Sequence, residues 1–203
     1  MNVNKVMVVV VLGAAVLAAL AMAVIESITG PRSTREALAC MAGEGVLGNY
    51  QTTEPPGAAV EAVMTDAKGA ERTLAEWRGS GLVLNFWATW CAPCVREMPA
   101  LDRLGPMVAG EGIKVLALSE DRGKPSVVET FYKKHAIKNL PVLMDKRRKL
   151  LTGFAVQGLP TTVLLNTNGN EVGRVVGVAE WDSDDAAAFL RRCLTPPPPA
   201  PGS

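Results

Sequence analysis

The sequence predicts an α/β fold in which a mixed central sheet is flanked by helices. Short apolar runs alternate with amphipathic stretches over residues 57–194, which is typical of strands that alternate with helices. Residues 82–87 are apolar except for Asn85, which indicates a strand buried on both faces. Residues 161–165 and 171–178 flank an Asn-Gly turn, so they are expected to form an antiparallel pair.

The other elements follow from the same periodicities. A hairpin around the turn signal at residues 67–69 (Ala-Lys-Gly) extends the sheet on its N-terminal side, and a helical turn over residues 74–78 follows it. The further predicted strands are residues 113–118 and 141–144, and the predicted helices are residues 91–107, 126–135, 146–154 and 183–194.

An apolar segment near the N-terminus, residues 6–25, is expected to be a transmembrane signal anchor. It carries no charged side chain and is long enough to span the roughly 30 Å hydrocarbon layer as a helix. Lys5 favours a cytoplasmic location for residues 1–5, which sends the rest of the chain across the membrane. A cleaved signal peptide is the alternative, because residues 21–23 (Ala-Met-Ala) fit a small-x-small cleavage pattern. Either way, the body of the protein is expected to be exported.

The exported part divides into three regions. Residues 26–56 are expected to form a lead-in, helical or irregular around residues 35–43, and then an extended linker that ends in proline and glycine. Residues 57–194 are the compact domain. Residues 195–203 are rich in proline and are expected to be a disordered tail.

The charges of the exported part balance. The 203 residues carry a formal net charge of +1, and Lys5 is the only charged side chain before Glu26, so 20 basic and 20 acidic residues remain from Glu26 onward. A neutral body exerts no bulk attraction on phosphates. Neither nucleic acid nor an anionic membrane surface is therefore expected as the main partner.

The four cysteines separate into two kinds. Cys91 and Cys94 form a Cys-x-x-Cys motif, whereas Cys40 and Cys193 stand alone near the two ends of the exported part. An oxidising compartment allows disulfides to persist. The close pair is therefore expected to be reactive and the distant pair structural.

The Cys-x-x-Cys motif lies where a predicted strand ends and a predicted helix begins. Unpaired backbone N–H groups and the positive end of the helix dipole favour a thiolate there, which makes Cys91 the expected nucleophile. Cys94, one helical turn further on, is placed to attack the mixed disulfide and release the partner. The motif predicts dithiol–disulfide exchange, with the Cys91–Cys94 disulfide as the redox-active group and no other cofactor.

Three other interpretations of the motif are weaker. A zinc site lacks its second half, because the other two cysteines are isolated and His135, the sole histidine, has no neighbouring ligand. A c-type haem site needs a histidine where the chain has Val95. No metal is therefore expected. A purely structural bridge is the remaining alternative, which the position between strand and helix disfavours.

Two motifs resemble those of thioredoxin-like proteins of the TlpA/ResA type. The first is residues 86–99, FWATWCAPCVREMP, and the second is residues 158–162, GLPTT. The resemblance covers roughly residues 57–194. It implies a thioredoxin-like fold, with the helix and strand of residues 125–144 as a central insertion, and thiol–disulfide exchange in the bacterial periplasm on the inner membrane. The isolated cysteines and the apolar N-terminal segment bring the chain nearest to the TlpA branch.

The resemblance assigns roles to residues around the cysteines. Pro160 matches a cis-proline opposite the motif, and Leu159 would present its main chain to an extended segment of the partner. Glu97 matches an acid near the cysteines, and Asn85 stands where ordinary thioredoxins carry a buried aspartate. Glu97 is thus the candidate general acid/base. The alternative for Glu97 is a solvated glutamate in the first helical turn.

Several further residues have expected places. Trp90 is expected to be a surface platform for the partner, or a shield over the nucleophile, and Pro93 restricts the turn of the motif. Cys40 and Cys193 are expected to form a structural disulfide that clamps the lead-in to the last helix, with two unpaired buried thiols as the alternative. His135 and the basic residues 146–149 are expected on solvated helix faces.

The motif itself is compatible with oxidation or reduction, and the resemblance implies reduction of cysteine pairs in exported clients. Resemblance suggests a copper chaperone and the copper-binding subunit of cytochrome oxidase as clients, in oxidase biogenesis, and a transmembrane thiol transporter as electron donor. The alternatives are reduction of apocytochrome c thiols, which Thr161 after the proline disfavours, and copper(I) binding by two thiolates. A monomer is sufficient for a single exchange site.

Overall fold

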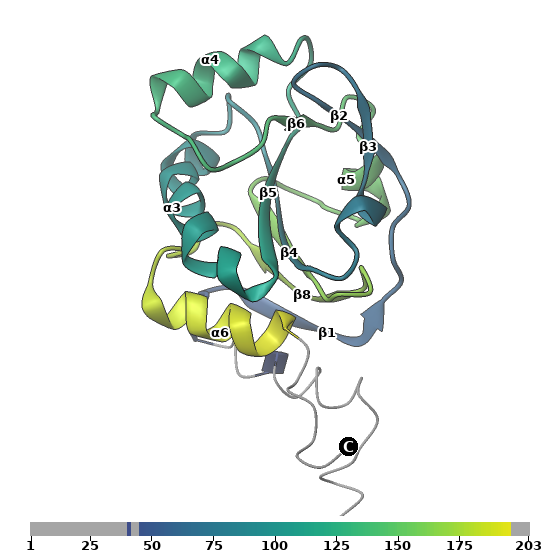
Figure 1. Cartoon of the computed structure of the whole chain (residues 1–203), viewed down its shortest axis with the longest axis vertical. Coiled ribbons are helices and arrows are strands. Elements are labelled where there is room, and N and C mark those ends of the chain that lie inside the picture. The colour runs from purple at the N-terminus through teal and green to yellow at the C-terminus, as the bar shows by residue number, and fades with distance from the viewer. Residues whose placement is uncertain (1–39, 42–44, 196–203) are drawn as a thin grey trace, which may run out of the picture. The chain divides into compact units, whose positions relative to one another are not determined.

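The computed structural model describes residues 40–41 and 45–195 (Figure 1). Within these residues, none of the helices is both long and apolar enough to cross a membrane. The predicted anchor, residues 6–25, and most of the predicted tail, residues 196–203, lie outside the described residues. The described residues all belong to one unit of the chain, Glu36–Ser203.

Among the described residues, eight strands form one mixed sheet in the order β1-β8-β7-β4-β5-β6-β2-β3. The central strands β4 and β5 are parallel, and β7 pairs with the other side of β4 in the antiparallel sense. The strands are β1 (Tyr50–Gly57), β2 (Val63–Asp66), β3 (Glu71–Thr73), β4 (Gly81–Trp87), β5 (Ile113–Ser119), β6 (Leu143–Met144), β7 (Thr161–Leu165) and β8 (Glu171–Val176).

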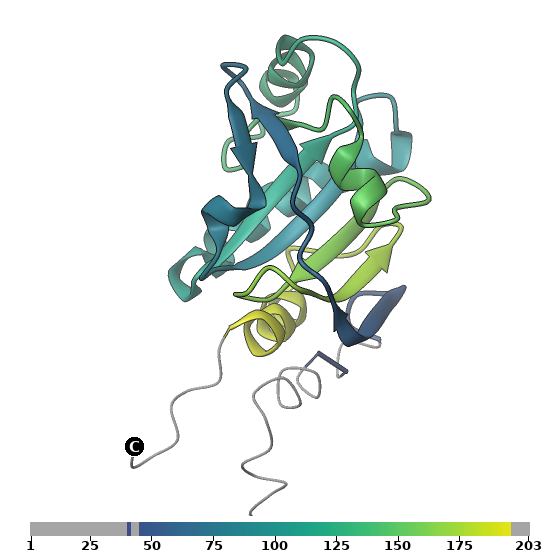
Figure 2. The same cartoon turned by 90° about the vertical axis from the view of Figure 1, so that its right-hand side faces the viewer.

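Helices cover both faces of this sheet, as the sequence predicts. In Figure 1, α3 and α6 lie on one side of the strands and α5 on the other, and Figure 2 views the sheet from the α5 side. The helices are α3 (Ala92–Val108), α4 (Ser126–Lys134), α5 (Lys149–Gly153) and α6 (Asp184–Leu194), with short 3-10 helices η1 (Leu74–Trp77) and η2 (Ala109–Glu111).

Strand β4 joins the two halves of the hydrophobic core. All seven of its residues are buried. Leu84 and Phe86 belong to the cluster beneath α5, whereas Val83 and Trp87 belong to the cluster beneath α3 and α6. Because successive side chains of a strand point to opposite faces, a strand that is apolar on both faces must be covered on both sides. The prediction from residues 82–87 is confirmed.

The predicted linker is different in the structure, because its last residues form the edge strand β1. Tyr50 and Thr52 pair with Val175 and Gly173 of β8. The ring of Tyr50 is buried, packs edge-on against Phe189 at 5.1 Å between centroids, and occupies the space that a side chain at position 173 would need. Pro55 and Pro56, which suggest a linker, are compatible with an edge strand, because such a strand pairs on one side only and can lack some backbone N–H donors.

Two short elements are also smaller than predicted. Strand β6 contains only Leu143–Met144, and helix α5 begins at Lys149 instead of residue 146. The carboxylate of Asp145 accepts hydrogen bonds from the backbone N–H groups of Lys149 and Leu151, at 2.8 and 2.9 Å. Residues 146–148 therefore form a turn that precedes α5. The basic side chains of residues 146–149 consequently do not lie on one helix face, contrary to the prediction from the sequence.

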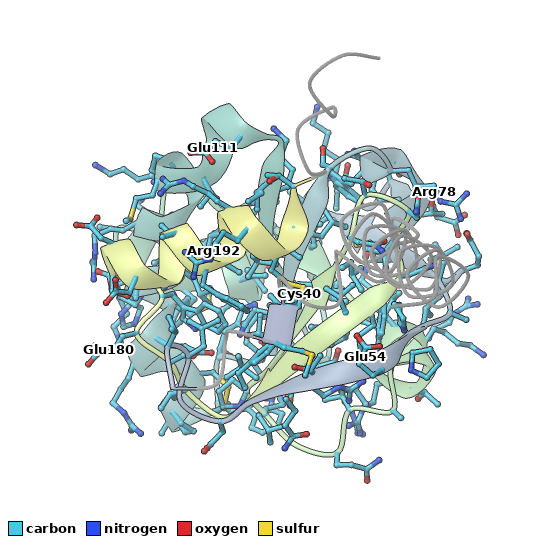
Figure 3. All side chains as sticks on the ribbon, turned by 90° about the horizontal axis from the view of Figure 1, so that it is seen from below. Cys40, Glu54, Arg78, Glu111, Glu180 and Arg192 are labelled. Atoms are coloured by element: carbon cyan, nitrogen blue, oxygen red, sulfur yellow. A yellow bond between two sulfur atoms is a disulfide. The ribbon has the colours of Figure 1, made fainter. Side chains whose placement is uncertain are left out.

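A disulfide joins Cys40 to Cys193 on α6, with an S–S distance of 1.99 Å across 153 positions of sequence. Both cysteines are buried in the core cluster, and Figure 3 shows Cys40 beside α6. The bond therefore ties the segment before β1 to the last helix.

We expect the double variant Cys40→Ala/Cys193→Ala to lose about 2–5 kcal/mol of unfolding free energy, because a long loop is no longer closed in the unfolded chain. Denaturant titration of the oxidised proteins measures this loss, and disulfide exchange at the other cysteine pair should persist. An unchanged denaturation midpoint would show that the bond does not stabilise the fold.

Candidate functional site

The Cys-x-x-Cys motif lies at the carboxyl end of β4. The chain leaves the sheet after Trp87, and Cys91 is the N-cap of α3. The Cys91 Sγ accepts a hydrogen bond from the backbone N–H of Cys94 at 3.3 Å, and Pro93 occupies the first turn, where a missing N–H costs nothing. The two sulfurs are 2.01 Å apart, so this is the oxidised, disulfide form.

The two cysteines differ in their access to the surface. Cys91 is 7% exposed and Cys94 is fully buried. A groove of about 880 Å³ runs past the disulfide, and Trp90, Cys91, Pro93 and Leu159 contribute to its walls. A partner that enters this groove meets Cys91, while Cys94 stays behind it in the core.

The second motif contributes Gly158 and Leu159 to the same groove. The Leu159–Pro160 peptide bond is cis, and the Pro160 carbonyl accepts a hydrogen bond from the N–H of Gly177 at 2.9 Å. Leu159 lines the groove while Pro160 is buried behind it. Trp90 is 70% exposed, which fits the predicted platform better than a shield. The fold therefore brings both motifs to one groove.

Glu97 lies in the core on α3, one helical turn after Cys94, and is 4% exposed. Its Oε1 accepts a hydrogen bond from Asn85 Nδ2 at 2.9 Å, and its Oε2 accepts one from Trp181 Nε1 at 3.0 Å. Asn85 Nδ2 also donates to Oγ1 of Thr162, its partner in the β4–β7 register, at 2.9 Å. The alternative of a solvated glutamate is therefore wrong.

The environment of Glu97 favours its neutral form. Burial raises the pKa of Glu97 above the ordinary value of a glutamate, although hydrogen bonds from Trp181, Asn85 and the backbone of Ala179 lower it. A raised pKa makes the ionised carboxylate of Glu97 a stronger base than that of an ordinary glutamate. Trp181 is a partner that the sequence analysis does not find.

Two acidic residues at the end of β5, Glu120 and Asp121, also belong to the site but are not among the residues predicted from the sequence. Asp121 accepts hydrogen bonds from the backbone N–H and hydroxyl of Thr89, at 2.9 and 2.7 Å, and one from the Ser119 hydroxyl at 2.8 Å. These bonds hold the loop that leads into Cys91. The signal was present, because polar residues that follow a parallel strand next to β4 share its carboxyl edge.

Glu120, beside Asp121, is a buried wall residue of the same groove. Burial and the charges of Asp145 and Asp121 raise the pKa of Glu120, and the charge of Arg148 lowers it, so that the resulting pKa is about 8. Arg148 comes from the turn before α5 and also lines the groove. The predicted solvated face of residues 146–149 therefore includes a residue of the site.

The remaining candidates lie elsewhere in the structure. His135 caps the end of α4 and stacks on Phe131, with ring centroids 4.2 Å apart. In the part of the chain that the structure describes, no three histidine, cysteine or acidic side chains are grouped so as to hold a metal ion.

Known proteins similar to this chain carry names from thiol chemistry. "Thiol-disulfide oxidoreductase ResA" of Geobacillus kaustophilus is 40% identical over 114 residues, which are 56% of this chain and 64% of that protein. The chain thus spans less than two thirds of that relative. The protein of the same name from Bacillus cereus is 34% identical over 134 residues, 66% of this chain and 75% of the relative.

Solved structures show the same fold. A thioredoxin-family thiol:disulfide interchange protein from Chlorobium tepidum is 26% identical, with a TM-score of 0.55, over 66% of this chain and 97% of that one. The exposed lipoprotein thioredoxin Etrx1 from Streptococcus pneumoniae is 25% identical, also with a TM-score of 0.55, over 66% and 98% of the two chains.

These likenesses agree with the mixed sheet, the flanking helices and the Cys-x-x-Cys motif at the start of α3. The predicted thioredoxin-like fold and the predicted kinship to ResA-type proteins are confirmed. Residues 56–171, more than half of the chain, match the AhpC/TSA family, and the chain belongs to that family.

Proposed function

We propose that the protein is a thiol–disulfide oxidoreductase that reduces cysteine pairs of exported proteins through Cys91 and Cys94. The observation that carries this proposal is the asymmetry of the pair, because Cys91 caps α3 at an open groove whereas Cys94 is buried behind it. Exchange needs one attacking sulfur that a partner can reach and a second that resolves the mixed disulfide. The names of the relatives support the same reaction class.

In the reduced protein, the Cys91 thiolate attacks one sulfur of the client disulfide, and the other client sulfur leaves as a thiolate. Cys94 loses its thiol proton and attacks the Cys91 Sγ, which closes the Cys91–Cys94 disulfide and releases the second client sulfur. Two electrons have then passed to the client, whose thiolates take up two protons. A dithiol donor must reduce the pair again before the next turnover.

Glu97 is the group that we propose to take the proton of Cys94. It is buried one helical turn from Cys94. The side chain of its neighbour Asn85 is an amide, which cannot take up a proton as a carboxylate would. Asn85 and Trp181 hold the two carboxyl oxygens of Glu97 and thus orient it. Pro93, Trp90 and Leu159 would position the client, with the main chain of Leu159 pairing with an extended client segment.

We propose that residues 6–25 tether the domain to the bacterial inner membrane, so that it works in the periplasm as a monomer. Resemblance to the TlpA branch supports clients whose cysteine pairs bind copper, namely a copper chaperone and the copper subunit of cytochrome oxidase. A transmembrane thiol transporter is the class of donor that could carry electrons to such a site.

If the protein is a reductase, the Cys91–Cys94 pair should have a reduction potential close to the value of about −270 mV for thioredoxin. Equilibration with glutathione or dithiothreitol buffers of known ratio measures this potential. A value near −120 mV, typical of an oxidant such as DsbA, would contradict the reductase direction.

The variant Cys94→Ala should accumulate a covalent mixed disulfide with a client, because the sulfur that resolves the intermediate is missing. Non-reducing electrophoresis and mass spectrometry detect the adduct and identify its bond to Cys91. The matched variant Cys91→Ala should give no adduct. Equal trapping by both variants would show that the cysteines do not have separate roles.

The variant Glu97→Gln should slow the resolving step by about 100-fold and remove an inflection from its pH profile, because the amide cannot titrate. In the wild type this inflection should lie above the ordinary pKa of a glutamate. Trp181→Phe keeps an aromatic ring but removes the donor that lowers the pKa of Glu97, so it should move the inflection to higher pH. Identical profiles in wild type and Glu97→Gln would exclude Glu97 from proton transfer.

A further inference from the structure

The carboxyl group of Glu120, in the wall of the groove beside Cys91, has no hydrogen-bond partner among the described residues. The side chain of Glu120 is 2% exposed, and neither Oε1 nor Oε2 accepts a hydrogen bond in this part of the chain. Buried carboxyl oxygens are normally paired, because an unpaired one loses its contacts with water and gains none in return. The Glu120 carboxyl group therefore lacks a hydrogen-bond donor that a bound ligand could supply.

The neighbouring carboxylates are satisfied, which makes Glu120 the exception in this part of the site. Asp145 accepts two backbone hydrogen bonds at the start of α5. Asp121 accepts hydrogen bonds from Thr89 and Ser119. Among the described residues, the cation paired with Glu120 is Arg148, whose Nε lies 3.7 Å from Oε2, too far for a hydrogen bond.

Because of its position, Glu120 can receive a hydrogen bond from a client protein that binds in the groove. Glu120 lines the same groove as Cys91 and Leu159, so a segment whose sulfur reaches Cys91 passes along its wall. We propose that Glu120 is a specificity-determining residue that binds a cationic side chain, lysine or arginine, close to the reactive cysteine of the client. This inference rests on the proposed exchange function and names one feature of its substrates.

The charges around Glu120 favour a cation over a neutral donor. Asp121, on the same loop, and Asp145, after β6, place two more carboxylates near Glu120. The cations of the groove are Arg148, from the turn before α5, and Arg122. The side chain of Arg148 is 59% exposed and can turn toward solvent when a client cation approaches. The client would then supply the charge-assisted hydrogen bonds that Glu120 lacks.

The preference should depend on pH. Burial and the charges of Asp145 and Asp121 hold the pKa of Glu120 at about 8, so the carboxyl is protonated at pH 6.5 and mostly ionised at pH 9. A cation binds the ionised form, and the arginine side chain stays charged at both pH values. Selectivity for a cationic client should therefore rise as the pH passes through 8.

The test uses the full reduced chain and two peptide disulfides, each a homodimer linked through a single cysteine. One peptide carries arginine near the cysteine and the other carries citrulline, which has nearly the same shape but no charge. At pH 9 the wild type should reduce the arginine peptide about tenfold faster in kcat/KM, the size expected for one charge-assisted hydrogen bond. At pH 6.5 the ratio should approach one.

Glu120→Gln should bring the ratio close to one at both pH values. Glu129→Gln, which neutralises an exposed glutamate on α4 outside the groove, should keep the preference of the wild type. The ratio of two peptides on one protein sample does not depend on how much of a variant has folded. Equal rates for both peptides in the wild type at pH 9, or a preference that survives in Glu120→Gln, would overturn the inference.

Hydroxyethyl disulfide, a small uncharged substrate, separates this inference from the proposed function. If the wild type does not reduce it, or either peptide, the exchange function itself fails. If the wild type reduces it but treats the two peptides alike at pH 9, only the role of Glu120 is wrong.

Discussion

Complete burial of strand β4 is the constraint on which the site depends. Because β4 is packed on both faces and paired on both edges, its carboxyl end has a fixed position, and the chain must turn there into α3. That turn makes Cys91 the N-cap of the helix and places Cys94 in the core one turn later. Asn85 of the same strand donates a hydrogen bond to Glu97, so β4 positions both the two cysteines and the Glu97 carboxyl group.

Two buried carboxyl groups flank the cysteines, and their hydrogen bonds separate their roles. Each oxygen of Glu97 accepts a hydrogen bond from a fixed side chain, which suits a group that exchanges protons without moving. Glu120 is equally buried at the groove but has no such donors among the described residues. A group of that kind is suited to an incoming ligand instead of to an internal network. We therefore propose that Glu97 serves the protein's own thiol and that Glu120 serves the client.

The parts of this picture that depend on local patterns can be predicted from the sequence. Periodicity finds the strands and helices around the cysteines, and the Cys-x-x-Cys spacing finds Cys91 and Cys94. Leu159 follows from the resemblance of residues 158–162 to a family motif. Edge strand β1 is missed because two prolines hide a pairing that depends on Tyr50 packing between β8 and α6. Glu120 is missed because its burial arises only when segments far apart in sequence, at β5 and before α5, come together.

The different roles of Cys91 and Cys94 can be measured directly in the reduced protein, as the alkylation rates of the two thiols. Alkylation by iodoacetamide at neutral pH, followed by peptide mapping, gives the rate for each thiol separately. Cys91 should react first and Cys94 at least about tenfold more slowly, because Cys91 caps the helix at the groove whereas Cys94 is buried. Equal rates, or faster modification of Cys94, would contradict these roles.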